Sequence, residues 1–479
     1  MNSRLAMTFA ATAALLGGCA VGPDFTPPAA PTTQSYTPAP VTLPAAGAAD
    51  VRQKLGAGAP VVAEWWTLFH SAALNDTLNL AISDSPSLEA ARATLAQAQE
   101  TVAAASGGFY PQVDLGAAAS RARTAGTKFN QGSAISNLFS VGPLVSYSPD
   151  LFGGTRRLVE QQSALAEFQQ YQLAAAYLTL TGNAVTEAVN IAGTREQLAA
   201  ADAIIQADRQ NLELVHLSVE SGKGAPADLL AAQSQLAADE ALVPPLRQLL
   251  ATSRDALAML VGKAPSEWQA PDFDFTNLEL PADLPLVVPS ELVHARPDIL
   301  AAEAQLHAAS AAIGIATANL YPSIALSASW TQQAATMGAL FEGPNGLWAV
   351  AASLTAPLFH GGTLQAEKRA AVDAFTAQLA TYRQTVLVSF QQVADVLQAL
   401  EHDAELIEAQ QHALDSATAS LRLAQESYAA GAGSFLQVLD AQRLYQQARL
   451  GYAKAKGQRY LDTVQLFAAM GGDWKAASH

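Results

Sequence analysis

Residues 321–331 read YPSIALSASWT, and this stretch decides the fold that the sequence predicts. Tyr321-Pro322 ends a helical pattern, because proline lacks the amide hydrogen that a helix uses and restricts the residue before it to extended backbone. From residue 323 onward, apolar and polar side chains alternate, which is the period of a strand with one apolar face. The apolar positions are Ile324, Leu326, Ala328 and Trp330, and the polar positions are Ser323, Ser327, Ser329 and Thr331.

The same landmarks occur twice along the chain, in the same order. Tyr110-Pro111 precedes Tyr321-Pro322 by 211 residues (321 − 110), and Gly222 precedes Gly431 by 209 residues (431 − 222). The further matched landmarks are Pro86 with Pro297, Leu151-Phe152-Gly153-Gly154 with Leu358-Phe359-His360-Gly361-Gly362, and Gly262 with Gly471. A repeat of this length exceeds any solenoid unit, so the sequence indicates a duplicated half-molecule.

Three further segments show strand-like alternation. We expect strands over about 112–122, 138–148 and 347–356, in addition to 323–332. Each has the ~9–11 residues of a tilted membrane-spanning strand. Pro143 lies inside the second segment, and because proline cannot donate to a ladder we expect a strand end, a bulge or a local register change there. The alternative interpretation is a pair of amphipathic hairpins on a soluble helical protein.

The rest of each half is helical. We expect helices over 87–106 and 298–319 that lead into the strands. After the strands, Gly153-Gly154 and Gly361-Gly362 are backbone hinges into a very long helix, which a glycine turn at Gly222 or Gly431 joins to a second long helix. The helix expected over 363–427 would span ~95 Å. Its larger apolar residues recur at steps of three and four, which is typical of a coiled coil: Phe375, Leu379, Tyr382, Val386, Phe390, Val393, Leu397 and Leu400.

Composition and motifs argue against several functions. The net charge of −16 would repel nucleic acid. The eight histidines lack metal-ligand spacing, no Lys-Ser/Thr pair follows either Gly-Gly hinge, and the acidic residues are scattered with no pair marked out for acid–base chemistry. We therefore expect neither an enzyme nor a metal or cofactor site.

The amino terminus has the features of an exported lipoprotein. Arg4 precedes a short apolar run, Leu5–Leu16, and the only cysteine, Cys19, follows Leu16-Gly17-Gly18, which resembles a lipoprotein signal. This resemblance implies cleavage before Cys19 and a covalent lipid on its side chain; the alternative is an ordinary signal peptide with a chance cysteine. Since no later stretch has about 18 consecutive apolar residues, we expect no helical membrane span after the signal.

These features predict the domain order. It is a signal peptide over 1–18, a lipid-anchored tether over 19–62, a first repeat over 63–275, a second repeat over 276–474 and a tail over 475–479. Four strands cannot close a barrel, and an open sheet edge cannot lie in lipid, so one copy is incomplete. Two copies would give about eight strands with a filled interior, whereas three would give about twelve and a water path, which favours a trimer.

Several motifs together resemble the outer-membrane efflux protein family. They are Gly18–Phe25, the paired Tyr-Pro sites, Leu358–Gly362, Val438–Arg443 and Met470–Trp474. Within the family the sequence is similar to the lipoprotein group often called NodT, with OprM-like and TolC-like channels as relatives. The resemblance implies a mixed α and transmembrane β fold, in which a homotrimer forms a 12-strand β-barrel continued by a long periplasmic α-helical barrel. It also implies an outer-membrane exit duct that works with a periplasmic adaptor and an inner-membrane RND-type transporter.

The resemblance further implies a gate after the second glycine turn. Asp440 matches an acidic residue that faces the channel axis in the family, Leu436 a constricting apolar position and Arg443 a basic position near the gate. Their spacings of four and three residues put them on one helix face. The alternative is that Asp440 and Arg443 form an exposed ion pair without a gating role. Gln437 stands where some relatives have a second acidic residue, which predicts a weaker electrostatic gate.

The rival to a channel is a periplasmic structural or adaptor lipoprotein with long coiled-coil hairpins. An adaptor usually has one hairpin flanked by compact β domains, whereas this sequence has two hairpins with membrane-length strands. A third hypothesis, a periplasmic enzyme, lacks a catalytic constellation. A substrate for export is not identified by any motif, because a broad duct selects weakly.

Overall fold

The computed structural model describes residues 20–39, 41, 43, 53–59, 61–124, 134–472 and 474. The expected signal peptide 1–18, the lipidation site Cys19 and the tail 475–479 therefore lie outside the described residues. The chain forms two compact units. The sheet unit comprises Met1–Pro28, Thr94–Gln169 and Ala301–Tyr382, and the core unit comprises Ala29–Ala93, Gln170–Leu300 and Arg383–His479. Each unit takes segments from both sequence repeats, so the repeat boundaries at 275 and 276 remain predictions.

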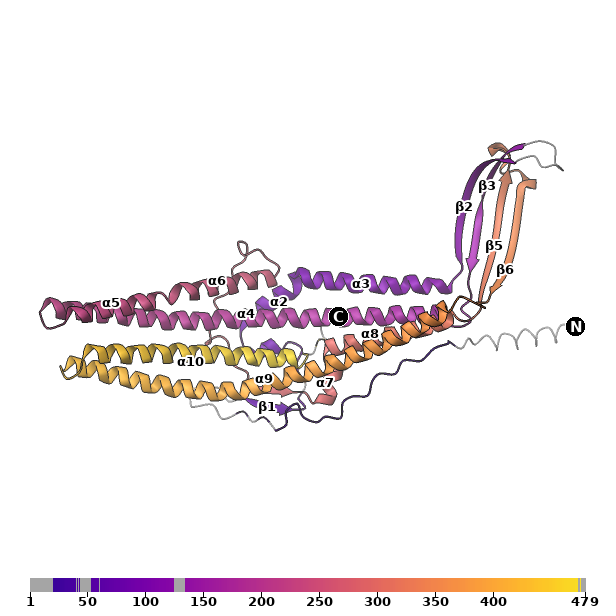
Figure 1. Ribbon diagram of the computed structural model, residues 1–479. Helices are drawn as coiled ribbons and strands as arrows, with labels where there is room; N and C mark the ends of the chain where they lie inside the picture. Colours follow the sequence, from indigo (N-terminus) through magenta and orange to yellow (C-terminus); the bar gives the residue numbers. More distant parts are fainter. Residues whose placement is uncertain are drawn as a thin grey trace. The chain divides into compact units, whose positions relative to one another are not determined.

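The sheet unit contains a four-stranded antiparallel sheet in the order β2-β3-β5-β6, as Figure 1 shows. The strands are β2 (Gln112–Thr124), β3 (Ala134–Tyr147), β5 (Ser323–Ala334) and β6 (Gly346–Thr355). All four expected strands are present, with ends within four residues of the expected ones. Trp330 lies opposite Trp348 and Val113 opposite Val145, so apolar residues share one face of the sheet.

The expectation of a strand end or register change at Pro143 is wrong. β3 runs through Pro143, which pairs with Leu115 of β2 in an unbroken register. Toward β5 the pairs at Gly142 and Pro143 are missing, but Val141 lies opposite Gln332 and Leu144 opposite Ser329, which is one register. Proline thus removes a hydrogen bond on one side only, and the adjacent glycine keeps the backbones close, because a Cβ on Gly142 would collide with the backbone oxygen of Trp330.

Long helices flank the sheet segments in both halves of the chain. They are α3 (Pro86–Ser106), α4 (Gly154–Glu220), α8 (Pro297–Ala318), α9 (Thr363–Ala429) and α10 (Phe435–Ala469). α4 and α9 each have 67 residues, or ~100 Å at the rise of an α-helix. The expected long helix of residues 363–427 is therefore confirmed to within two residues at its end.

The closing helix of the first half differs from the expectation of one long helix. It is divided into α5 (Pro226–Glu240) and α6 (Val243–Leu260) at Ala241-Leu242. Pro244 and Pro245 follow the break, and neither can donate the amide hydrogen bond that would continue α5. The second half has no proline at this place, and α10 is continuous.

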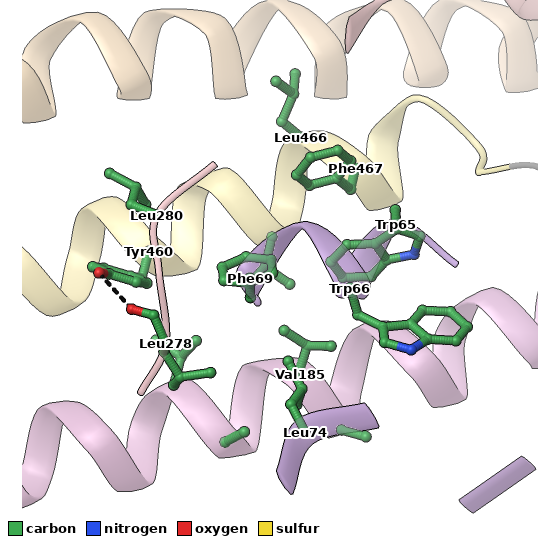
Figure 2. Close-up of a cluster of buried hydrophobic side chains, with 14 of the residues drawn as sticks. Trp65, Trp66, Phe69, Leu74, Val185, Leu278, Leu280, Tyr460, Leu466 and Phe467 are labelled. Carbon is green, nitrogen blue, oxygen red and sulfur yellow. Dashed lines mark hydrogen bonds between the residues drawn. The ribbon is translucent and has the colours of Figure 1, made fainter. Parts of the chain in front are cut away.

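The core unit is built on buried aromatic residues (Figure 2). Trp65 of η1 (Trp65–Phe69) is 1% exposed and stacks on Phe467 of α10 with ring centroids 5.1 Å apart. Tyr460 donates from its hydroxyl to the carbonyl oxygen of Leu278 at 2.9 Å. The Trp65 contact fixes α10 against η1, which precedes α2 (Ala72–Asp84), and the Tyr460 bond fixes α10 against the segment that precedes β4 (Asp283–Leu286). α4 supplies Val185 to the same cluster.

Part of the segment expected to be a tether is attached to this core. β1 (Lys54–Ala57) pairs in parallel with β4 (Asp283–Leu286), which precedes α7 (Pro289–Ala295). Tyr36 donates to the carbonyl oxygen of Val287 at 2.7 Å. The absence of periodicity hid these contacts, since a four-residue strand and one aromatic anchor leave no repeating pattern.

One described helix, α8, is long and apolar enough to cross a membrane. The expectation that run length excludes every helical span was therefore too strict. However, 56% of its most apolar window is buried, and its alanines pack inside the protein, as in the core helix of a soluble protein.

Candidate gate at the helical turns

The two glycine turns have the same geometry in both halves of the chain. Gly222 has φ 71° and Gly431 has φ 73°, in the left-handed region that glycine adopts without strain. After each, an amide reaches back to close the helix end: Lys223 donates to Ser218 at 2.9 Å, and Ala432 donates to Ser427 at 2.9 Å. The repeat therefore preserves a tight reversal between long helices.

A capping box begins α10 immediately after the second turn. The Ser434 hydroxyl accepts from the Gln437 amide at 3.4 Å, and the Gln437 side chain accepts from the Ser434 amide at 3.0 Å. Both orphan donors of the helix start are thereby satisfied. Gln437, which the sequence marked only as a missing acidic residue, has a structural task here.

The three expected gate residues project from the exposed face of the first turns of α10. Leu436 is 65% exposed, and the side chains of Asp440 and Arg443 are 62% and 60% exposed. A guanidinium nitrogen of Arg443 lies 3.7 Å from a carboxylate oxygen of Asp440, so the pair is an exposed i,i+3 ion pair in a single copy. Such a pair contributes only ~0.3–0.5 kcal/mol.

The opposite face of the same helix is firmly packed. Phe435 and Val438 are 4% and 3% exposed and join a cluster with Val215 of α4 and Ala232 of α5. Tyr428 of α9 contacts Phe435 with ring centroids 5.7 Å apart. Three helices, α4, α5 and α9, thus hold α10 in place, while the side chains of Leu436 and Asp440 remain exposed toward a ligand or another chain.

A buried pair of carboxyl groups, which the scattered acidic residues of the sequence did not reveal, lies in the same helical region. Asp208 of α4 and Asp239 of α5 are 3% and 4% exposed. Burial, with the Asp239 carboxylate beside it, raises the pKa of Asp208 to about 8. Its Oδ2 atom has no partner among the described residues unless one proton is shared between the two carboxyl groups.

Amide side chains complete this network. Gln442 donates to Asp208, and Gln446 and Gln235 donate to Asp239 at 2.5 Å and 2.8 Å. The sequence signal was present but weak. Asp208 occupies an apolar stripe of α4 between Ile204 and Val215, where an aspartate is unusual.

A second pair of the same kind joins α9 and α10. Asp403 is 7% and Asp462 6% exposed. Burial and the neighbouring Asp462 raise the pKa of Asp403 to about 8, with the Arg459 guanidinium opposing the shift. No group of three or more histidine, cysteine or acidic side chains suited to a metal ion occurs within the described part of the chain.

Asp208→Asn tests the shared proton. Unfolded aspartate titrates near 3.8, whereas folded Asp208 keeps its proton to about pH 8. Between these values the folded protein binds more protons than the unfolded chain, so this pair lowers stability as pH rises from about 4 to about 8. Asparagine can donate to Asp239 and accept from Gln442 without a charge to bury. We expect the thermal midpoint of the Asp208→Asn protein to exceed that of the natural protein at pH 8 and to equal it at pH 4.

In a protein of this size the shift is about 1–2 °C for each kcal/mol of penalty removed, because the entropy of unfolding grows with the number of residues. Asp415→Asn is the matched control, because Asp415 is exposed on α9 and accepts from Gln411 at 2.8 Å. It should leave the pH dependence unchanged. A difference between Asp208→Asn and the natural protein that is the same at pH 4 and pH 8 would contradict the shared proton.

The remaining turn residues of the sequence analysis lie at the foot of the sheet. Tyr110-Pro111 precedes β2 and Tyr321-Pro322 precedes β5. Gly153 has φ 77°, Gly361 φ 59° and Gly362 φ 87°, while Gly154 begins α4. The Phe152 ring stacks on Tyr321 with centroids 4.8 Å apart.

Arg157, which no sequence pattern marked, holds the segment that follows Cys19 against the start of α4. Arg157 is 4% exposed and donates to the carbonyl oxygen of Val21 at 3.2 Å, to Asp24 at 2.8 Å and to Glu160 at 2.7 Å. The Val21 amide in turn donates to the carbonyl oxygen of Phe152 at 3.1 Å. A lone arginine in the first turn of a long helix gave no signal, because its partners are about 130 residues away in sequence.

Residues 77–263 and 288–472 match the family model described as outer membrane efflux protein. The chain is 29% identical over 450 residues to the pyoverdine export outer membrane protein OpmQ of Pseudomonas putida, which covers 92% of this chain and 95% of that protein. It is 27% identical over 472 residues to the probable efflux pump outer membrane protein TtgC of Pseudomonas putida, covering 98% and 95%. The solved outer-membrane channel OprN has a TM-score of 0.86 and 26% identity, covering 95% of this chain and all of that one.

Proposed function

This chain belongs to the outer membrane efflux protein family, and we propose that three copies of it close a twelve-strand barrel continued by a helical tube in the periplasm. It is an outer-membrane channel component of a tripartite, RND-type efflux system, and it extends into the periplasm. The family consists of transport proteins and not of enzymes. Small molecules therefore pass through this protein without covalent change.

The observation that carries the barrel is a four-stranded sheet with an exposed apolar face. Among the described residues, Leu115, Trp348, Val350 and Leu354 of that face are 69–77% exposed in one copy. β2 and β6 end the sheet, and each has one unpaired edge. An unpaired edge is not tolerated in lipid, and three copies of four strands give twelve in a closed ring.

The partners follow from this role. We propose that a periplasmic adaptor joins the helical tube to an inner-membrane RND-type transporter, which supplies the energy and the substrate selection. We also propose a covalent lipid on Cys19 as the only prosthetic group. Mass spectrometry of the mature amino terminus tests the lipid, and unmodified Cys19 would contradict it.

The gate is proposed to lie at the first turns of α10. In a trimer with these turns near the axis, Leu436 forms an apolar ring and Asp440 a ring of three carboxylates. Carboxylates in such a ring attract cations. The support is the exposure of both side chains on a helix whose other face is anchored in the Phe435–Val438 cluster.

We expect Asp440→Ala to raise ion leak through the purified channel in a planar bilayer. The carboxylate ring binds divalent cations that block the path, and its loss removes this block, so conductance in their presence should rise at least about twofold. Asp395→Ala is the matched control, since Asp395 is exposed on α9 far along the helix from the turn. Unchanged conductance and unchanged cation sensitivity in Asp440→Ala would rule out the gate assignment and leave the simple ion pair with Arg443.

The channel itself is tested by heat-modifiable migration on a gel together with outer-membrane fractionation. A barrel migrates differently before and after boiling and remains with the outer membrane. A periplasmic structural or adaptor lipoprotein would lack the heat shift, which would decide against the channel.

A further inference from the structure

At the foot of the sheet, an aromatic contact joins β3 to β5, and the corresponding contact between β6 and β2 is not made among the described residues of one copy of the chain. Where β3 leaves the sheet and β5 enters it, Phe152 stacks on Tyr321 with ring centroids 4.8 Å apart and planes at 21°. Beside them the Ser148 hydroxyl donates to the carbonyl oxygen of Ile324 at 3.0 Å. The junction thus joins the second strand of the first repeat to the first strand of the second repeat.

The internal repeat supplies a second set of the same residues. An offset of 207 places Phe359 and Thr355 where Phe152 and Ser148 stand (359 − 152 and 355 − 148), and an offset of 211 places Tyr110 where Tyr321 stands (321 − 110). The extra residue of the second repeat, His360, comes after the phenylalanine, so the spacing from hydroxyl to ring is four residues in both sets.

This second set is divided between the two edges of the sheet. Tyr110 precedes β2, and Phe359 follows β6, which lie at opposite ends of the strand order. In one copy Phe359 is 88% and Tyr110 69% exposed. Within the described part of the chain, neither ring has the aromatic contact of its counterpart, and because β2 and β6 are the two edges of one sheet, the rings can meet each other through a second copy of the chain.

We propose that β6 of one copy pairs antiparallel with β2 of the next in the register that β3 and β5 use, with Phe359 stacked on Tyr110 of the neighbouring copy. The inference rests on the proposed trimer and adds its residue-level contact. In the sheet, Tyr147 of β3 lies opposite Leu326 of β5. Adding 207 to the first number and subtracting 211 from the second gives the corresponding pair between two copies, which is Leu354 of β6 opposite Leu115 of β2. Thr355 takes the place of Ser148 as the hydroxyl donor.

The two faces of the sheet agree with this register. It sets Leu354 against Leu115 and Ala352 against Ala117 on the apolar face, and Thr355 against Asp114 on the other. A slip of one residue would move one strand's apolar side chains to the polar face of its partner. A slip of two or more residues would separate Phe359 from Tyr110, so it would not reproduce the stack that Phe152 and Tyr321 form.

Disulfide cross-linking tests the register in the full-length protein. In Leu115→Cys/Leu354→Cys, oxidation should convert most of the protein into a covalent trimer, because directly opposed residues have Cα atoms ~4.5–5.5 Å apart, within the reach of a disulfide. Leu115→Cys/Val350→Cys is the matched control on the same face. Its cysteines are offset by four residues, or ~13 Å, and should not cross-link.

The outcomes separate this inference from the proposed function. If light scattering shows a trimer but the control pair cross-links in place of Leu115→Cys/Leu354→Cys, the register is wrong and the trimer stands. If the unmodified protein is a monomer, the trimer itself fails.

A second measurement addresses the aromatic stack. We expect Phe359→Ala and Tyr110→Ala each to lower the temperature at which the trimer dissociates on a gel, and the double variant to lower it no further than the larger single effect. Effects that add in the double variant would overturn the stack.

Discussion

Trp65→Ala is expected to cause the largest loss of stability of any single change in the core unit. Trp65 is 1% exposed and contacts three aromatic rings: Phe467 at 5.1 Å, Trp66 at 6.1 Å and Phe69 at 6.3 Å between centroids. Truncation removes this buried area and leaves a cavity that the rigid long helices cannot close. We expect a loss of about 3–5 kcal/mol in the free energy of unfolding.

The measurement is the thermal or denaturant midpoint of the detergent-solubilised protein. Trp65→Phe serves as a graded variant, since it keeps a ring against Phe467 and should lose less than half as much. Trp348→Ala is the matched control, because this tryptophan is 77% exposed on β6 and has no part in the core unit. If Trp65→Ala melted within one degree of the natural protein, the cluster of Figure 2 would not be the core that joins α10 to α4.

The strands could be predicted from the sequence because their two causes are local. Tyr-Pro stops a helix, and alternation of apolar and polar residues marks a strand, so all four strands were located. The expectation of one long closing helix failed at Pro244-Pro245, because neither proline can donate the amide hydrogen bond that would continue α5. The expectation at Pro143 also failed, because the tolerance of that proline depends on Gly142 and on the backbone of the neighbouring strand.

The gate region shows the limit of such reasoning. Spacing along one helix was enough to put Leu436, Asp440 and Arg443 on one face, because helix geometry is local. The carboxyl pair of Asp208 and Asp239 comes from different helices, and its shared proton depends on burial that only packing creates. The role of Gln437 in the capping box was readable in the Ser434-x-x-Gln437 pattern but was outweighed by comparison with acidic relatives.

The second large effect is expected in the sheet unit, for Arg157→Ala. The substitution removes a buried cation that ties residues 21–24 to the start of α4. Among the described residues, it leaves Glu160 with the His307 contact at 3.1 Å. We expect the free energy of local opening of the amino-terminal segment to fall by about 3 kcal/mol. Breaking a buried ion pair costs about 3–5 kcal/mol, and the lower end applies because the Asp24 partner is exposed.

Hydrogen exchange followed by mass spectrometry measures this directly. The amide of Val21, bonded to Phe152 at 3.1 Å, should exchange roughly 100-fold faster in Arg157→Ala. Arg157→Lys should give an intermediate rate, because one ammonium group cannot reach Val21, Asp24 and Glu160 at once. Asp24→Asn, which alters a side chain that is 95% exposed, is the control and should change the rate little. Exchange at Val21 that does not respond to Arg157→Ala would mean that other contacts hold the segment.

The expected result bears on the lipid anchor as well as on stability. The segment held by Arg157 begins at Val21, two residues after Cys19, and the Val21 amide is bonded to Phe152, which follows β3 at the foot of the sheet. If Cys19 carries the proposed lipid, the described segment that follows it is therefore bonded to the foot of the sheet. Arg157→Ala should then leave lipidation and membrane attachment intact while slowing trimer formation, because the chain can still reach the bilayer but no longer presents its sheet at a fixed place beside it. Trimer yield and hydrogen exchange can be measured on the same preparation of Arg157→Ala. A normal trimer yield together with faster exchange at Val21 would mean that the contact of Arg157 with residues 21–24 contributes to local stability and not to trimer formation.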